Sequence, residues 1–333
     1  MKSIQCVFLW VFAVFVLPGC SINRMATRAV ADALTGTGSS TVFTGDDDPQ
    51  LVGDAMPFAI KMYEALLNEA PDHRGLIITT GSLFVMYANA FVQGPAEFLP
   101  SIRYEERQAA RQRAKKLYLR GIKILMGGIE EKYPGFAGAS VEGGDLAPLL
   151  KEMEEDDVPL LYWSAAGTFS AFSLDPFDFS LGKEVPDCMA YIDRAYELDP
   201  GFNSGALDDL YVLTYASLPP AMGGDVSRAD LHFQRSLEKS GGKLAGPYVS
   251  YAQAVALPAQ NYDAFRSCLE AALEIDVDAD PKNRLVNIIS QKKARELLDR
   301  AGDYFFLTED GELDVEAYQE YEVDLEYEGD YAL

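Results

Sequence analysis

The sequence predicts an all-α fold, and three observations carry that prediction. Apolar residues recur every three or four positions through most of the chain, which is the periodicity of helices with one buried face. Gly and Pro, as in Gly94-Pro95, end the periodic segments at short intervals. Alternating Val, Ile and Thr runs bounded by hairpin turns, which would predict strands, are missing.

The expected helices follow one another from residue 50 to residue 299. The first begins after Asp46-Asp47-Asp48, where Asp48 serves as N-cap and Pro49 takes the first helical position; we favour this interpretation over a cation site. This first helix ends before Pro71. The second expected helix is more apolar, and the third carries the basic residues of an otherwise acidic chain. Gaps or loops, several with Gly or Pro, separate the later helices. The expected ranges are 50–69, 74–93, 102–132, 145–154, 158–174, 186–198, 203–217, 225–239, 244–257, 261–274 and 280–299.

Five of these helices share one spaced set of residues: a small residue, an apolar residue four positions later, and a small or apolar residue three further on. This spacing puts all three on one helix face. It resembles the second half of a tetratricopeptide repeat (TPR), where the small residue lets the paired helix approach closely. We therefore predict a TPR-like array of helical hairpins over residues 43–306. The five sets are Ala59/Tyr63/Leu66, Ala114/Tyr118/Gly121, Cys188/Ile192/Ala195, Ala229/Phe233/Ser236 and Ala264/Cys268/Ala271.

The N-terminus has the features of a lipoprotein signal peptide. A basic residue precedes the apolar run Val7 to Leu17, which is too short for a membrane-spanning helix. The segment Leu17-Pro18-Gly19-Cys20 resembles the lipobox of bacterial lipoproteins. That resemblance implies removal of residues 1–19 and lipidation of Cys20; the alternative is a plain signal peptide with an incidental cysteine. Ser21 stands where an aspartate retention signal would stand, which favours the outer membrane.

The composition argues against nucleic-acid binding, metal binding and catalysis. A net charge of −24 repels the phosphate backbone. Beyond Cys20 the chain has two cysteines, Cys188 and Cys268, which lie among small and apolar residues and are expected as core thiols; the two histidines are His73 and His232. No GxSxG, P-loop or HExxH motif is present, so we expect no catalytic residue, no metal and no cofactor.

Two flanking segments differ from the helical domain. Residues 20–42 are rich in Ser, Thr, Ala and Gly, and we expect a tether between the lipid and the domain. Residues 307–333 form an acidic tail of a kind that is typically flexible and solvated. The basic helix over 102–132 is expected to present a solvated face or to pair with the protein's own carboxylates, and the sharper alternative is that the acidic tail docks on it.

Aromatic and amide side chains occur on otherwise apolar helices. The stretch Met86 to Phe91 contains Asn89 among apolar neighbours, and Tyr162-Trp163-Ser164 is similar. Such residues suit the binding of an apolar ligand with a few polar contacts in a helical array, and the alternative is that the aromatic side chains are simply core. The candidate ligand-binding residues are Tyr87, Asn89, Phe91, Arg120, Tyr162 and Trp163.

Several blocks of the sequence, in order, resemble one known family. The blocks are Phe43 to Pro49, Pro57-Phe58, Ala65 to Leu67, Gly81 to Phe84, Tyr87 to Phe91, Lys116 to Gly121, Tyr162-Trp163, Gly223 to Asp225, His232-Phe233 and Arg284 to Asn287. Together they resemble the T-component lipoproteins associated with tripartite ATP-independent periplasmic (TRAP) transporters, over about residues 20–306. The resemblance implies TPR-like helical hairpins, a lipid anchor, and association with the transporter's solute-binding P-component. It also allows a homotrimer with a pore through each protomer for a small hydrophobic ligand, and it brings no catalytic residues.

We therefore expect a non-enzymatic, periplasm-facing lipoprotein, anchored to the membrane through Cys20, that serves as the accessory T-component of a TRAP-type uptake system. Two alternatives stay open. One is a helical-repeat scaffold lipoprotein in envelope assembly, with partners but no small ligand. The other is an all-helical (α/α) hydrolase, a fold that uses two carboxylates and is normally longer and richer in Trp.

Overall fold

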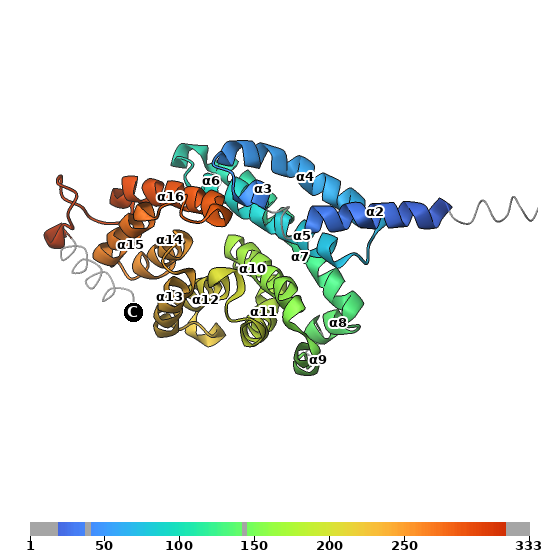
Figure 1. Ribbon diagram of the computed structural model, residues 1–333. Coiled ribbons are helices and arrows are strands. Elements are labelled where there is room, and N and C mark those ends of the chain that lie inside the picture. Colours follow the sequence, from blue (N-terminus) through green and yellow to red (C-terminus); the bar gives the residue numbers. More distant parts are fainter. Residues whose placement is uncertain (1–18, 37–40, 142–144, 318–333) are drawn as a thin grey trace, which may run out of the picture. The chain divides into compact units, whose positions relative to one another are not determined.

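The computed structural model describes residues 19–36, 41–141 and 145–317, and helices form nearly all of its regular structure (Figure 1). Within these ranges no strand forms, and the extended backbone pairs once, at the isolated bridge between Leu307 and Leu313. The all-α prediction is confirmed. The expected signal peptide (except its last residue) and the last residues of the acidic tail lie outside the described residues.

The chain divides into two compact units, Met1–Asp199 and Pro200–Leu333. The described helices of unit 1 are α2 (Gly19–Thr35), α3 (Thr41–Thr44), α4 (Pro49–Glu69), α5 (Arg74–Tyr87), the π-helix η1 (Ala88–Gln93), α6 (Gly94–Glu97), η2 (Ser101–Arg103), α7 (Tyr104–Lys132), α8 (Phe136–Val141), α9 (Ala147–Glu152), η3 (Glu155–Asp157), α10 (Val158–Leu174) and α11 (Phe179–Leu198).

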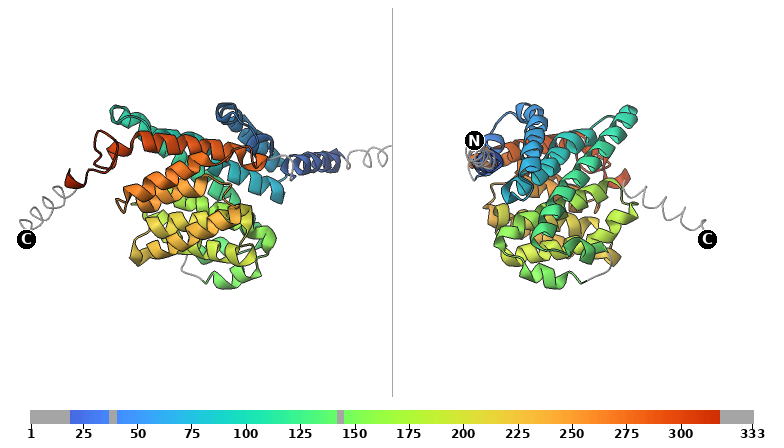
Figure 2. Two further views of the ribbon diagram at one scale, coloured as in Figure 1. Left: turned by 60° about the vertical axis from the view of Figure 1, so that its left-hand side comes forward. Right: turned by 90° about the vertical axis from the view of Figure 1, so that its right-hand side faces the viewer.

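Unit 2 continues the same pattern of consecutive helices. Its described helices are η4 (Phe202–Ser204), α12 (Ala206–Ser217), η5 (Pro220–Met222), α13 (Val226–Ser240), α14 (Gly246–Tyr251), the π-helix η6 (Ala252–Ala256), α15 (Tyr262–Glu274), η7 (Pro281–Asn283), α16 (Arg284–Asp299) and η8 (Ala301–Asp303). Helices that follow each other in sequence pack side by side, as α12 does on α13 and α15 on α16 (Figure 2).

The helix starts follow from side-chain capping. Asp48 accepts hydrogen bonds from the backbone N–H groups of Gln50 and Leu51, with Pro49 in the first helical position, as expected from the sequence. Asp178 caps α11 in the same way, so that helix begins at Phe179 and not near residue 186 as expected. The expectation failed because Pro186 is typical of a helix start, whereas here it lies inside the helix.

The core of unit 1 depends on close approach between α5, α7 and α10. A Cβ added to Gly121 would lie 2.7 Å from the backbone oxygen of Gly81, and one added to Gly128 would lie 2.5 Å from the Ile77 side chain. At Gly167 on α10 an added Cβ would lie 2.9 Å from Ile122. These glycines therefore let the helix backbones come nearer than any larger residue would allow.

Most of the residues in the five predicted repeat sets face the interior. All three positions are buried in the sets on α7, α11 and α13, and the middle residue is buried in all five. The hairpins α10–α11, α12–α13 and α14–α15 each pair one such helix with its predecessor. This arrangement agrees with the spacing argument, and the assignment to TPR-like repeats stays a prediction.

Helix α2 packs against α4 and α5 within unit 1. Ala31 is fully buried, and the Tyr63 hydroxyl donates to the backbone oxygen of Leu34 at 2.9 Å. His73 Nε2 lies 3.0 Å from Asp32 Oδ1, and Arg28 pairs with Asp72. Part of the segment expected to be a tether is thus a helix held on the domain.

One helical run in the described part of the chain, Arg74–Glu97, is long and apolar enough to cross a membrane by length and composition. Of its most apolar window, 61% is buried inside the protein. A core helix of this kind passes the same test as a membrane span.

Candidate functional site

The six candidate ligand residues all lie in unit 1. Tyr87 ends α5, and Asn89 and Phe91 lie in the π-helix η1 that continues it. Arg120 is on α7, and Tyr162 with Trp163 are on α10. The continuous segment of α5 and η1 packs against α7, and so does α10. The fold therefore brings together three parts of the chain that are far apart in sequence.

Tyr87 and Phe91 are packed partners. Their rings stack with centroids 5.9 Å apart, and Tyr87 is buried. The Arg113 guanidinium lies 5.6 Å from the Tyr87 ring centroid and donates to its hydroxyl at 3.3 Å. A Cβ added to Gly53 on α4 would lie 2.7 Å from Phe91, so that ring rests directly on the α4 backbone. Both rings therefore hold η1 in place, the core role that the sequence left open.

Asn89 belongs to a polar cluster around Tyr118. The side chain of Asn89 is exposed, but it reaches the Tyr118 hydroxyl, as does Ser170 of α10. Tyr118 is fully buried, donates to Gln93 Oε1 at 2.7 Å, and has its pKa raised because burial disfavours the phenolate. The sequence analysis placed Tyr118 in the repeat core but did not predict the hydrogen bonds of its hydroxyl group. The sequence feature that could have indicated them is the pair of amide side chains Asn89 and Gln93, one helical turn apart.

The backbone at Asn89 is π-helical, with the Gly94 N–H bonded to the Asn89 carbonyl five residues earlier. Single π-turns inside α-helices occur frequently at functional sites. A second π-helix, η6, follows Tyr251 in unit 2, and Tyr251-Ala252-Gln253-Ala254 resembles Tyr87-Ala88-Asn89-Ala90 with Gln in place of Asn. In both units the π-helix therefore begins directly after this tyrosine, a similarity that the spacing analysis did not find.

Arg120 ties α7 to α4. Its guanidinium lies 4.8 Å from the Phe84 ring centroid and pairs with Glu64. The side chain is 47% exposed, so the cation is accessible but already has a carboxylate partner. Arg120 therefore carries a structural contact that a ligand anion would have to displace.

Tyr162 and Trp163 lie on a half-buried face of α10. Their rings meet edge to face with centroids 4.9 Å apart. Ala166, Phe169 and Ser170 share that face and are also partly exposed, whereas the opposite face of the helix is buried against α7 and α11. Of the six candidates, these two keep partly exposed aromatic surface on one continuous helix face.

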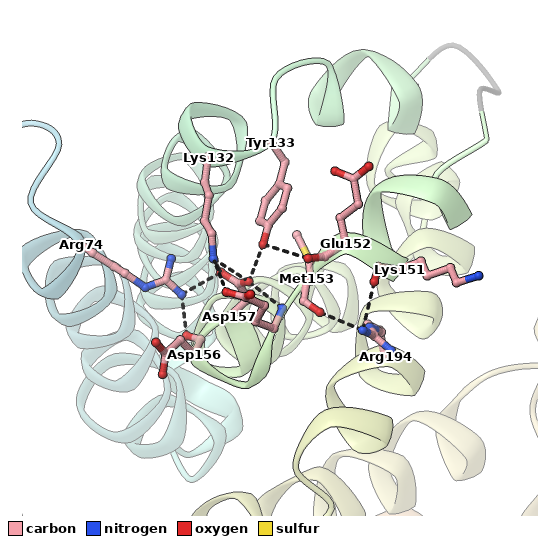
Figure 3. A network of polar contacts seen from close by, with 10 residues as sticks. Arg74, Lys132, Tyr133, Lys151, Glu152, Met153, Asp156, Asp157 and Arg194 are labelled. Carbon is pink, nitrogen blue, oxygen red and sulfur yellow. Dashed lines mark hydrogen bonds and ion pairs between the residues drawn. The ribbon is translucent and has the colours of Figure 1, made fainter.

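A buried carboxylate joins the ends of three elements of unit 1 (Figure 3). Asp157 is fully buried and accepts hydrogen bonds from Tyr133 at 2.6 Å, Lys132 at 3.0 Å, Arg74 at 2.8 Å and the backbone N–H of Glu154 at 2.9 Å. Burial alone would raise the pKa of Asp157, but these hydrogen bonds outweigh it and lower the pKa. Every partner belongs to the protein itself, so the cluster is a structural clamp.

A second buried carboxylate organises unit 2. Asp208 Oδ1 lies 2.7 Å from His232 Nδ1, and its other oxygen pairs with Lys239 at 2.5 Å. The His232 ring stacks on Tyr211 with centroids 4.3 Å apart and also contacts Tyr215. Burial would raise the pKa of Asp208, and the His232 and Lys239 contacts lower it overall. These contacts fasten α13 to α12.

The two cysteines of the domain are free and buried, in agreement with the expectation of core thiols. Burial raises the pKa of both, to about 11 for Cys268, so neither forms thiolate readily. Among the described residues, no group of three or more His, Cys, Asp or Glu side chains is arranged to hold a metal ion.

Comparison with known proteins identifies the family. The family model described as "TRAP transporter T-component" matches residues 45–305. The chain belongs to the TRAP transporter T-component family. An uncharacterized protein of Treponema pallidum (strain Nichols) is 35% identical over 301 residues, which cover 86% of this chain and 93% of that protein. The resemblance found in the sequence is therefore confirmed.

As a member of the T-component family, this helical protein is an accessory component of a TRAP transporter. The match begins at Gly45, before α4, and ends at Phe305, after η8. It therefore includes both π-helices, both buried carboxylate clusters and all six candidate residues, and it leaves out the Cys20 segment and the acidic tail.

Proposed function

We propose that this T-component is a non-enzymatic, periplasm-facing lipoprotein that binds the solute-binding P-component of its TRAP transporter and holds a small hydrophobic ligand. The observation that carries the proposal is the family match over residues 45–305, which spans both compact units. The T-component of a transporter must meet its other components, and a chain of paired helices offers broad surfaces for such a contact.

The lipid anchor of the proposal is Cys20, in the first turn of α2. Acyl chains at that position fix the chain to a membrane surface, since each buried methylene contributes about 0.8 kcal/mol. Because the second half of α2 is held on α4 and α5, the anchor would keep unit 1 near the membrane and not at the end of a long loose tether. Replacing Cys20 with Ala should release the protein from the membrane fraction.

The ligand contact of the proposal is the partly exposed face of α10, with Tyr162 and Trp163, together with Asn89 on η1. Aromatic rings with a few amide and hydroxyl groups suit an apolar ligand with limited polarity. Tyr87 and Phe91 contribute by positioning η1, and Arg120 by holding α7 against α4. If Asn89→Leu and Trp163→Ala fold normally and leave ligand binding unchanged, this assignment is wrong.

The decisive experiment measures binding of the mature chain to the solute-binding protein encoded nearest to it, by calorimetry or biolayer interferometry. Saturable binding supports the proposal. Absence of binding between two folded proteins, with the acylated form also tested, favours the envelope scaffold, and turnover of a glycan or ester by the purified chain would favour the hydrolase.

A further inference from the structure

The chain does not leave unit 2 where its last long helix, α16, ends. Phe305 is 4% exposed, and its ring lies against that of Tyr262 on α15, with centroids 5.2 Å apart. The Tyr262 hydroxyl donates to the Gly311 carbonyl at 2.9 Å, and Arg266 pairs with Glu312 at 3.1 Å. The first part of the acidic tail is therefore held on α15 by aromatic contacts and an ion pair.

This first part of the tail turns back toward α16. Leu307 and Leu313 form an antiparallel bridge, and the Asp314 N–H donates to the Phe306 carbonyl at 2.9 Å. Phe306 follows η8, the short turn after α16, by three residues. The returning strand of this hairpin therefore directs the chain toward the C-terminal end of α16 just before the described residues end.

The exposed face of α16 is basic. From Lys282 to Arg295 the sequence has five basic residues and no acidic one. Lys292 and Arg295 are exposed, and their spacing places them on one helix face with the partly exposed Ile288. Neither cation has an ion-pair or hydrogen-bond partner among the described residues. In a chain with a net charge of −24, this face carries positive charge that its own surroundings leave unbalanced.

The basic helix α7, which the sequence analysis named as a docking site for the tail, is already largely neutralised. Four of its basic side chains, or of the turn before it, pair with carboxylates of unit 1: Arg103, Lys115, Arg120 and Lys132. Lys116 and Lys123 are exposed without such a pair. Moreover, the tail and α16 belong to the same compact unit, so docking on α16 requires no particular arrangement of the two units.

We propose that residues 318–333, which lie outside the described residues, dock along the exposed face of α16 and balance its positive charge. This segment has six acidic residues and no basic one, opposite in sign to the face. From Tyr321 to Glu328 apolar and acidic residues alternate, so the segment supplies apolar contacts as well as carboxylates. The docked tail closes this face to other acidic partners.

The length of the tail is sufficient for this contact. Sixteen extended residues span about 50 Å, whereas the 16 residues of α16 rise about 24 Å, so the segment can follow the whole face from its C-terminal end. The inference goes beyond the proposed function and does not depend on the P-component or on a ligand.

The first test uses the mature full-length chain in detergent at low ionic strength, with a carbodiimide that joins a lysine amine to a carboxylate in contact with it. Mass spectrometry should find cross-links from Lys292 to the acidic residues of the segment 318–333. In 1 M NaCl their yield should fall about fivefold, because salt screens exposed charges. Mixing normal and 15N-labelled protein should show that both ends of each cross-link belong to one chain.

The second test measures hydrogen exchange of the backbone amides in the segment 318–333. The double variant Lys292→Glu/Arg295→Glu should speed this exchange about fivefold, because it replaces attraction by repulsion. Lys116→Glu/Lys123→Glu on α7 is the matched control, since it changes the net charge equally at two exposed positions, and it should leave the exchange unchanged. Melting temperatures check that both variants fold.

Four results overturn the proposal. They are cross-links that join the tail mainly to α7, cross-links only between different chains, tail exchange that the α16 variant does not change, and a wild-type tail that gives no cross-link to α16. Faster exchange in the α7 variant alone would instead make α7 the docking site of the tail.

Discussion

Asp157→Ala tests how much of the stability of unit 1 depends on its buried clamp. The substitution removes the acceptor of hydrogen bonds from four groups, and it leaves the Glu154 N–H without this partner and the Tyr133 hydroxyl with only its 3.4 Å contact to the Glu152 carbonyl. Breaking a buried charged cluster at one member costs about 3–5 kcal/mol. Arg74 and Lys132 are 35% and 38% exposed and regain water, so we expect the lower end of that range, about 3 kcal/mol.

For a unit of this size, about 3 kcal/mol corresponds to a fall in melting temperature of roughly 6–12 °C. Thermal and urea unfolding followed by circular dichroism measure it. Asp156→Ala is the matched control, because its side chain is exposed and only its backbone oxygen contacts Arg74; its effect should stay within about 0.5 kcal/mol.

The effect should also depend on pH in a defined direction. The pKa of Asp157 is lowered in the fold, so its contribution is complete above the unfolded value near 3.9 and disappears as pH falls through the folded value. The difference between wild type and Asp157→Ala should therefore be constant from pH 5 to 8 and shrink in stronger acid. A neutral-pH difference below about 1 kcal/mol, or one that persists unchanged at pH 2, would refute the clamp.

Three further predictions concern two carboxylates of unit 2 and two glycines of α7. Asp208→Asn should destabilise the protein by about 3 kcal/mol at pH 7. The loss should be smaller in strong acid, because the pKa of Asp208 is lowered in the fold, and urea unfolding at pH 7 and pH 3 measures both values. Asp209 lies in the first turn of α12, and its Oδ1 has no hydrogen-bond partner among the described residues. Asp209→Asn should stabilise the protein by at most about 3 kcal/mol above pH 6, because burial raises the pKa of Asp209 to about 6. The gain should vanish below about pH 3, where the folded and unfolded states both bind the proton. Gly121→Ala should lower the free energy of unfolding by about 1–3 kcal/mol, because the added Cβ meets the backbone of Gly81. On the same helix, a Cβ added at Gly127 meets nothing within 4 Å, so Gly127→Ala should stabilise the protein by about 0.5–1 kcal/mol. Equal effects of the two substitutions in urea unfolding would contradict the close helix packing.

Helical periodicity and capping predicted most of the fold. The expected helix over 158–174 is α10 residue for residue. The range 50–69 differs from α4 by one residue at its start, and 225–239 is shifted by one residue at both ends relative to α13. These helices have strong periodicity and clear start signals, so local sequence is enough to locate them. The expected helix over 244–257 is α14 with its π-helical continuation, because the sequence pattern does not separate an i→i+4 bond from an i→i+5 bond.

The candidate site was less predictable, because its contacts join residues far apart in the sequence. The partner of Asn89 is Tyr118, and the partner of Tyr87 is Arg113, and neither pairing can be read from one helix. The roles of Asp157 and Asp208 could not be predicted for another reason. In a chain with 52 acidic residues, nothing in the sequence separates a buried carboxylate from those that only keep the protein soluble.

Binding between the mature chain and its cognate solute-binding P-component tests the transporter role most directly. The account predicts saturable, stoichiometric binding by calorimetry. Two folded proteins that show no binding at high micromolar concentration, with and without the lipid on Cys20, would contradict it.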